Sequence, residues 1–141
     1  MTPLLALIML VAAHAEIDYR VVATVVQIES DWDATAVSPA GAVGLMQIMP
    51  YEAGPAFADR PTAEELAAPH VNVATGCNIL RANLRYYEGD WRKALCAYNM
   101  GIGGLNRRGL DDDNAVLYLE RFAVAWAQLW PGEALPWEEV S

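Results

Sequence analysis

The spacing of apolar residues constrains the fold of this chain more than any other feature of its sequence. Apolar side chains recur every three or four residues, as between Ile17 and Ile28, which places them along one side of an α-helix. No segment sustains the apolar-polar alternation that is typical of a strand. Glycine and proline interrupt the helical pattern many times. The chain is therefore expected to be all-α, with several short helices joined by loops.

Capping residues indicate where these helices begin and end. Asp18 is suited to cap a first amphipathic helix that ends near Asp31. Thr62 and Glu65 have the spacing of a capping box, which predicts a short helix ending before Pro69. Further patterns predict a short apolar turn at 43–49 and helices at 73–87, at 91–100, and from the aspartates at 111–113 to about Trp130.

Length and charge limit what the chain does. At 141 residues it has room for one domain, and we expect residues 131–141 to form an acidic tail. The net charge of -9 would be repelled by a phosphate backbone, so no nucleic-acid partner is expected. Six of the nine basic residues nevertheless fall between Arg81 and Arg108. They indicate either a rim for an anionic polymer or a solvated helix face, and the second interpretation is the more usual one.

The first fifteen residues have the character of a signal peptide. Their apolar run is too short to span a bilayer, and Ala13-His14-Ala15 fits the small-x-small cleavage pattern. The missing Lys or Arg before the run counts against this interpretation, and a first helix packed on the core or a weak membrane anchor are the alternatives. We expect residues 1–15 to be a signal peptide and residues 16–130 the folded domain, with no stable membrane span after cleavage.

The two cysteines, Cys77 and Cys96, occur in apolar helical patterns and lack the spacing of a zinc site. A buried cysteine behaves as a small hydrophobic residue, so we expect two free thiols. An exported protein would permit a disulfide between them instead. Neither a metal nor a cofactor is expected.

Glu29 is the principal candidate for a catalytic residue. It follows Val25 by four positions and Val22 by seven, so it lies on the apolar side of its helix. Loss of hydration there would raise the pKa of its carboxyl group and allow it to act as a general acid near neutral pH. A glutamate at the end of a helix also has the alternative of extending into water. Glu29 by itself does not distinguish these interpretations.

The residues around and after Glu29 do distinguish them. The run Glu29-Ser30-Asp31-Trp32-Asp33, followed by residues 36–50 with Gly44-Leu45-Met46-Gln47, closely resembles the signature of the soluble lytic transglycosylase family. Two later blocks resemble the same family in order and spacing: Asn72-Val73-Ala74-Thr75-Gly76 and Ala97-Tyr98-Asn99-Met100-Gly101. Tyr118 resembles the tyrosine of that family's last catalytic helix. The resemblance covers about residues 17–125.

This resemblance implies a goose-type-lysozyme-like domain, with its short helices arranged around a substrate cleft. It implies that Glu29 is the catalytic acid and base, and that Tyr118 orients it. The other site residues that it implies contact the glycan: Ser30, Gly44, Leu45, Met46, Gln47, Tyr98 and Asn99. Leu45 and Met46 have the alternative of being ordinary core, and the tyrosines of being merely buried.

The number of nearby carboxylates bears on the mechanism. Most glycosidases use two, but here Asp31 would point away from Glu29 and Asp33 has a position typical of a cap or turn. A single acid favours a substrate-assisted cleavage of the β-1,4 bond after N-acetylmuramic acid, which yields a 1,6-anhydromuramyl product. A hydrolytic muramidase and a non-catalytic peptidoglycan-binding or assembly protein are the alternatives.

Such a function sets the expected surroundings. The partner would be the glycan strands of peptidoglycan, and the protein would be a monomer. It would be exported and act in the periplasm or outside the cell, or be encoded by a phage and associated with the virion. Wall recycling, phage lysis or entry, and assembly of a secretion machine are all compatible with the sequence.

Overall fold

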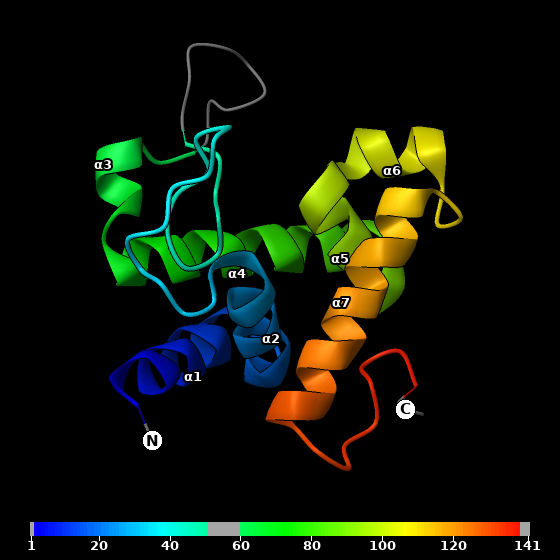
Figure 1. Cartoon of the computed structure of the whole chain (residues 1–141), viewed down its shortest axis with the longest axis horizontal. Helices are drawn as coiled ribbons and strands as arrows, with labels where there is room; N and C mark the ends of the chain where they lie inside the picture. Colours follow the sequence, from blue (N-terminus) through cyan, green and yellow to red (C-terminus); the bar gives the residue numbers. More distant parts are fainter. Residues whose placement is uncertain (1, 51–59, 139–141) are drawn as a thin grey trace. The chain divides into compact units, whose positions relative to one another are not determined.

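The computed structural model of the chain describes residues 2–50 and 60–138. Within these residues the secondary structure is helical apart from two isolated β-bridges, which confirms the predicted fold class (Figure 1). The helices are α1 (Pro3–Ala15), α2 (Tyr19–Ser30), α3 (Ala63–Leu66), α4 (Pro69–Tyr86), α5 (Trp91–Met100), α6 (Ile102–Arg108) and α7 (Asp113–Leu129). The chain forms two compact units, Met1–Asn78 and Ile79–Ser141, and α4 continues from the first into the second.

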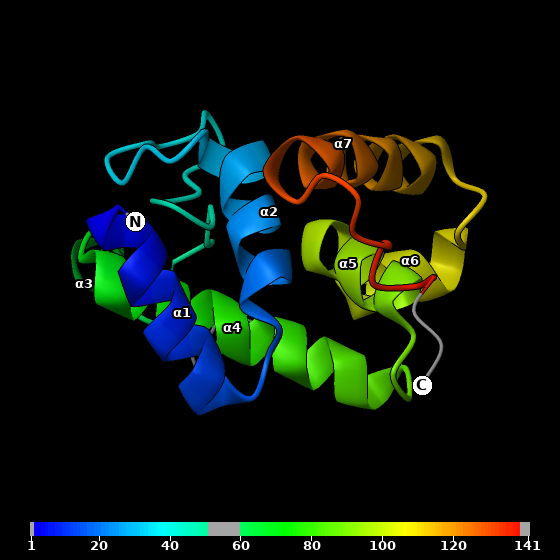
Figure 2. The same cartoon turned by 90° about the horizontal axis from the view of Figure 1, so that it is seen from below.

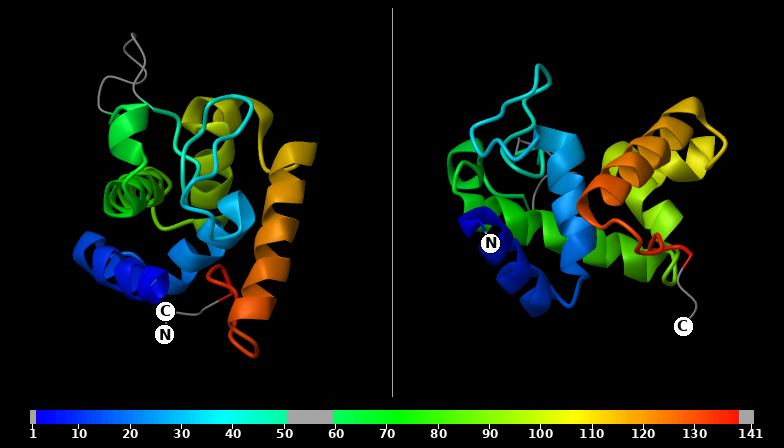
Figure 3. Two further views of the ribbon diagram at one scale, coloured as in Figure 1. Left: turned by 60° about the vertical axis from the view of Figure 1, so that its left-hand side comes forward. Right: turned by 60° about the horizontal axis from the view of Figure 1, so that its bottom comes forward.

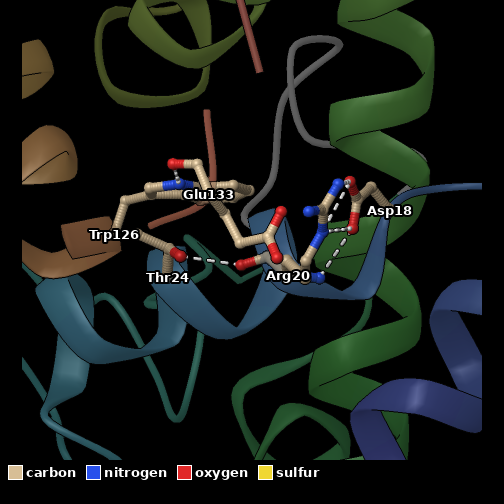
Figure 4. Close-up of polar contacts among 5 residues, drawn as sticks. All are labelled: Asp18, Arg20, Thr24, Trp126 and Glu133. Atoms are coloured by element: carbon tan, nitrogen blue, oxygen red, sulfur yellow. Dashed lines mark hydrogen bonds and ion pairs between the residues drawn. The ribbon is translucent and has the colours of Figure 1, made fainter. Parts of the chain in front are cut away.

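Helix α2 is the central element of the first unit. Asp18 caps it, as predicted: its carboxylate accepts a hydrogen bond from the Arg20 backbone N–H at 2.9 Å and pairs with the Arg20 guanidinium at 2.7 Å (Figure 4). The Thr24 hydroxyl donates to the carbonyl of Arg20 at 2.7 Å, also drawn in Figure 4. Burial of the four valines at 21, 22, 25 and 26 outweighs their modest helix propensity.

Helix α1 packs against α2. The Thr2 hydroxyl caps it by accepting from the backbone N–H of Leu5, and the side chains of Ile8 and Ala12 are fully buried. This arrangement fits the alternative of a first helix packed on the core. Cleavage after Ala15 stays a prediction, and it would remove α1 and uncover the surface of α2 that α1 covers. Among the described residues, no helix is long and apolar enough to cross a membrane.

The second unit is built around α5, which packs against α6 and α7 (Figure 2). Its interior includes a cluster of four buried side chains: Cys96, Ala97, Leu105 and Ala115. Helix α6 lies between the predicted helices at 91–100 and 111–130, in a stretch for which the sequence predicts no helix because it contains the glycines at 101, 103 and 104. It forms because Leu105 is buried in this cluster, and burial outweighs the low helix propensity of glycine.

The segment after α7 is packed within the second unit. The Trp126 indole N–H donates to the carbonyl of Glu133 at 3.1 Å (Figure 4). The ring of Trp137 lies 5.7 Å from that of Phe122, and the Arg92 guanidinium lies 5.8 Å from the Trp137 ring. The expected tail at 131–141 is thus anchored over residues 131–138, while residues 139–141 lie outside the described residues.

Both cysteines are buried, free thiols, as expected. Burial raises the pKa of Cys77 to about 12 and that of Cys96 to about 11, the latter with a smaller effect of the Asp90 charge. Because the reactive thiolate is then scarce below pH 10, a disulfide-exchange reagent at pH 8 should label neither thiol quickly in the native protein. In guanidinium without a reductant, both should react at once. Protection of the pair under those conditions would show a disulfide.

Candidate active site

Glu29 lies in the last turn of α2. The valines four and seven positions before it are fully buried, and Glu29 itself is half-buried, because it stands where the helix leaves the interior. Glu29 thus lies on the apolar side of the helix, as predicted from the sequence. The carboxyl group of Glu29 is therefore positioned by a helix that is capped at its start and buried over residues 21–26.

The chain reverses direction directly after Glu29. Asp31 and Trp32 both adopt left-handed backbone conformations, with φ of 51° and 65°. Such angles are uncommon for residues other than glycine, and they cluster at functional sites. The Ser30 hydroxyl donates to the carbonyl of Val26 at 3.1 Å, so this half-buried residue is held against the helix.

Asp33 has the turn role that the sequence indicated. Its Oδ1 atom accepts hydrogen bonds from the hydroxyl of Thr35 at 2.7 Å and from the backbone N–H of Thr35 at 2.9 Å. These two bonds, the one from the hydroxyl first, hold the pKa of Asp33 below its ordinary value. Asp31, at the C-cap of α2, is exposed. Asp33 is therefore ionised at neutral pH and engaged in a local turn.

The segment from Asp31 to Pro50 is a long loop that folds back on itself, drawn in blue to cyan in Figure 3. Isolated bridges pair Val43 with Val37 and with Ile48. The side chain of Asn72, on α4, holds this loop from inside. Its Nδ2 donates to the carbonyls of Val43 at 2.7 Å and Leu66 at 3.1 Å, and its Oδ1 accepts from the backbone N–H of Met46 at 2.8 Å.

Two glycines leave room for the contacts between this loop and α4. A Cβ atom on Gly44 would overlap the Nδ2 of Asn72 and lie 2.9 Å from its Cγ, and Gly44 has a φ of 77°. A Cβ atom on Gly76 would overlap the sulfur of Met46. Asn72 belongs to one of the sequence motifs but is not among the predicted site residues. The signal that identifies it is an amide side chain within an otherwise apolar part of α4.

The loop residues predicted to line the groove differ in their exposure. Leu45 and Met46 have no exposed surface, and Gly44 is also buried, which fits the alternative of core packing. Gln47 is half-buried at a φ of 50°, and its amide nitrogen donates to the carbonyls of Ala36 at 3.2 Å and Gly44 at 2.9 Å. Gln47 is thus the one of these four whose side chain reaches the surface.

The remaining predicted residues belong to the second unit. On α5, Tyr98 is half-buried and Asn99 is exposed. Tyr118 lies on α7, which packs against α5, and only 5% of its surface is exposed. Glu29, Ser30 and the 44–47 loop belong to the first unit. The convergence of the two groups on one cleft stays a prediction.

Comparison with known sequences identifies the relatives of this chain. The sequence model of the transglycosylase SLT domain matches residues 7–115, which is more than half of the chain. A transglycosylase of Enterobacteria phage PRD1 is 39% identical over 100 residues, covering 67% of this chain and 34% of that protein. A membrane-bound lytic murein transglycosylase C of Actinobacillus succinogenes is 31% identical over 116 residues, covering 73% and 32% respectively. The chain spans about a third of the length of these curated relatives.

Solved structures share the fold. An inactive mutant of the lytic transglycosylase Slt from Pseudomonas aeruginosa has a TM-score of 0.71 at 21% identity, covering 93% of this chain and 25% of that one. The 70-kDa soluble lytic transglycosylase of Escherichia coli has a TM-score of 0.59 at 23% identity, covering 90% and 21% respectively. These likenesses confirm the fold that the sequence led us to expect.

Proposed function

Because the chain belongs to the transglycosylase SLT domain family, we propose that it cleaves peptidoglycan at the β-1,4 bond between N-acetylmuramic acid and N-acetylglucosamine. Glu29 is the general acid and then the general base of this reaction. The relatives from phage PRD1 and Actinobacillus succinogenes carry the names of transglycosylases, which supports the assignment of the reaction.

One observation carries the single-acid mechanism: the different surroundings of the three neighbouring carboxylates. Asp33 is held by Thr35 in a turn, and Asp31 is an exposed helix cap. Glu29 alone is half-buried on the apolar side of α2. It also stands in the last turn of that helix, with the buried Val22 and Val25 on the same side. Of these three carboxylates, Glu29 is therefore the one with partly dry surroundings.

The chemistry follows from one acid and no second carboxylate. Glu29 gives its proton to the glycosidic oxygen as the bond from C1 of the muramyl sugar breaks. The 2-acetamido group of the same sugar stabilises the cationic C1. The ionised Glu29 then takes the proton of the C6 hydroxyl, whose oxygen closes onto C1 and forms the 1,6-anhydro ring. Proximity favours this closure, and the carboxyl group ends protonated, as it began.

The other site residues have supporting roles in this proposal. Gln47 binds a sugar through its Oε1 atom, which accepts no hydrogen bond in the described part of the chain. Tyr98 and Asn99 contact the glycan, and Tyr118 orients Glu29. Ser30 shapes the wall beside the acid, while Gly44, Leu45 and Met46 act through the packing of their loop.

The products of purified sacculi test the proposal. We expect mass spectrometry to find muropeptides that end in an anhydromuramyl residue, each lighter by one water molecule than the hydrolysed form, because a hydroxyl of the sugar replaces water as nucleophile. Addition of water at the new ends would show a muramidase. Absence of both products from a folded, sacculus-binding protein would show a non-catalytic binding protein.

The substrate also sets where the protein acts. Peptidoglycan lies outside the cytoplasmic membrane, so we propose that the protein reaches the cell wall either by export or as part of a phage particle. The phage PRD1 relative is compatible with the second setting.

A further inference from the structure

The basic residues of the second unit are segregated from its acidic residues. Between residues 81 and 108 there are six Arg or Lys and two acidic residues, Glu88 and Asp90, whereas Arg121 is the sole base after residue 108. Exposed cations here include Arg85, Lys93 and Arg107, and none of them forms an ion pair within the described residues. In a chain with 18 acidic residues and 9 basic ones, this separation is unexpected for charges that serve only solubility.

Helix stability does not explain Lys93. It occupies the first turn of α5, where the helix dipole favours anions and opposes a cation. Asp90 already caps this helix by accepting from the backbone N–H of Lys93 at 3.1 Å. A glutamate in place of Lys93 would complete a capping box, so lysine is the less stabilising choice for the helix.

Lys93 stands beside an ordered aromatic platform. Its Nζ lies 5.9 Å from the centre of the Tyr87 ring, which meets the Tyr86 ring edge-on at 4.8 Å. The Tyr87 hydroxyl donates to the Oδ1 of Asn106 at 2.9 Å, and the Nδ2 of Asn106 donates to the Tyr86 hydroxyl at 3.0 Å. Tyr86 is held in this way although 57% of its surface is exposed. A ring fixed before binding loses little entropy when a ligand covers it.

Arg107 follows Asn106 on α6 and extends along that helix toward Gly103, where a Cβ atom would lie 3.2 Å from its guanidinium nitrogen. Lys93 thus lies beside two ordered tyrosine rings and an amide, and Arg107 is a further exposed cation on the neighbouring helix α6. The cations can pair with carboxylates, the amide can form hydrogen bonds with peptide groups, and the ring can contact apolar side chains of a ligand.

We propose that this surface, formed by Tyr86, Tyr87, Lys93 and Asn106, binds the carboxylate-bearing stem peptides of peptidoglycan. The identity of the partner rests on the proposed function. The net charge of -9 opposes a polyphosphate partner, whereas a short peptide with isolated carboxylates meets the local positive charge alone.

A charge reversal with a matched control tests the proposal. Lys93→Glu and Arg121→Glu change the net charge equally, and both residues are exposed on helices of the same unit. Both are placed in a Glu29→Gln background, and binding to purified sacculi is measured by co-sedimentation at low and high salt. Lys93→Glu should weaken binding roughly three- to ten-fold at low salt. Arg121→Glu should change it less than two-fold, and the difference should shrink at high salt.

Further binding measurements identify the ligand. Glycan strands freed of stem peptides by an amidase still carry one lactyl carboxylate on each muramyl residue, so Lys93→Glu should weaken binding to them less than binding to sacculi. The melting temperature of Lys93→Glu should stay close to that of the parent, because the capping box that it gains offsets the contact with the Tyr87 ring that it loses, so weaker binding would not reflect misfolding. Equal effects of the two variants on sacculi would overturn the proposal. So would a Lys93 effect that is as large on stripped glycan as on sacculi, or one confined to anionic lipid vesicles. If Glu29→Gln itself retained turnover, the proposed acid would be wrong, while the binding difference would still stand.

Discussion

Replacing Glu29 with glutamine is expected to lower muropeptide release from sacculi by about 10⁴-fold or more, since general acid-base catalysis supplies about 10² to 10⁴ and one residue serves both steps. Glutamine is close in shape to glutamate and fits the half-buried position at the end of α2. It offers a hydrogen bond to the glycosidic oxygen but has no proton to transfer. Glycan binding and folding should therefore remain, as co-sedimentation and circular dichroism would show.

The two neighbouring aspartates provide the controls. Asp31→Asn and Asp33→Asn each remove one carboxylate within four positions of Glu29. Each should lose far less activity, because Asp31 is an exposed cap and Asp33 serves the Thr35 turn. An asparagine side chain at position 33 would still accept a hydrogen bond from Thr35, so the turn should form. If Asp33→Asn were as inactive as Glu29→Gln, a two-carboxylate hydrolase would replace the single-acid mechanism.

A methyl group at Gly44 is expected to damage the fold far more than one at Gly41. Both glycines have a positive φ, 77° and 95°, so alanine at either carries a backbone cost of about 1–2 kcal/mol. Only Gly44 lacks space: its Cβ would overlap the amide of Asn72 and approach the carbonyl of Leu66 to 3.3 Å, whereas nothing lies within 4 Å at Gly41.

Displacing the Asn72 amide endangers three buried hydrogen bonds, and each unsatisfied group costs about 1–3 kcal/mol. Gly44→Ala should therefore lower the free energy of unfolding by about 3 kcal/mol or more, against about 1–2 kcal/mol for Gly41→Ala. Urea denaturation followed by circular dichroism measures both. Activity of Gly44→Ala should also fall, because Gln47 is hydrogen-bonded to the Gly44 carbonyl. Equal losses at the two positions would disprove the role assigned to Asn72.

The sequence by itself determined the helices whose ends carry their own signals. Asp18, Thr62 and the aspartates before α7 were recognised as caps because a capping side chain bonds to backbone groups two or three residues away. The predicted range of α5 was also correct, since its amphipathic pattern is closed by Gly101. The sequence predicts that α4 starts at Val73, four residues later than its observed start at Pro69, because a proline that limits one helix can also occupy the first position of the next.

Only the tertiary structure decided the remainder, since it depends on contacts between residues far apart in the chain. Asn72 bonds to groups 26 and 29 positions away, and no local pattern reveals that it holds the 44–47 loop. The same loop sequence was compatible with Leu45 and Met46 at a surface or in the core, and the fold buries both, with the sulfur of Met46 against Gly76 of α4. Helix α6 forms although it contains two glycines, because the side chain of Leu105 is buried in the interior of the second unit. Capping hydrogen bonds can be predicted from a short stretch of sequence, because their partners are two or three residues apart. The burial of a side chain depends on which distant residues pack against it.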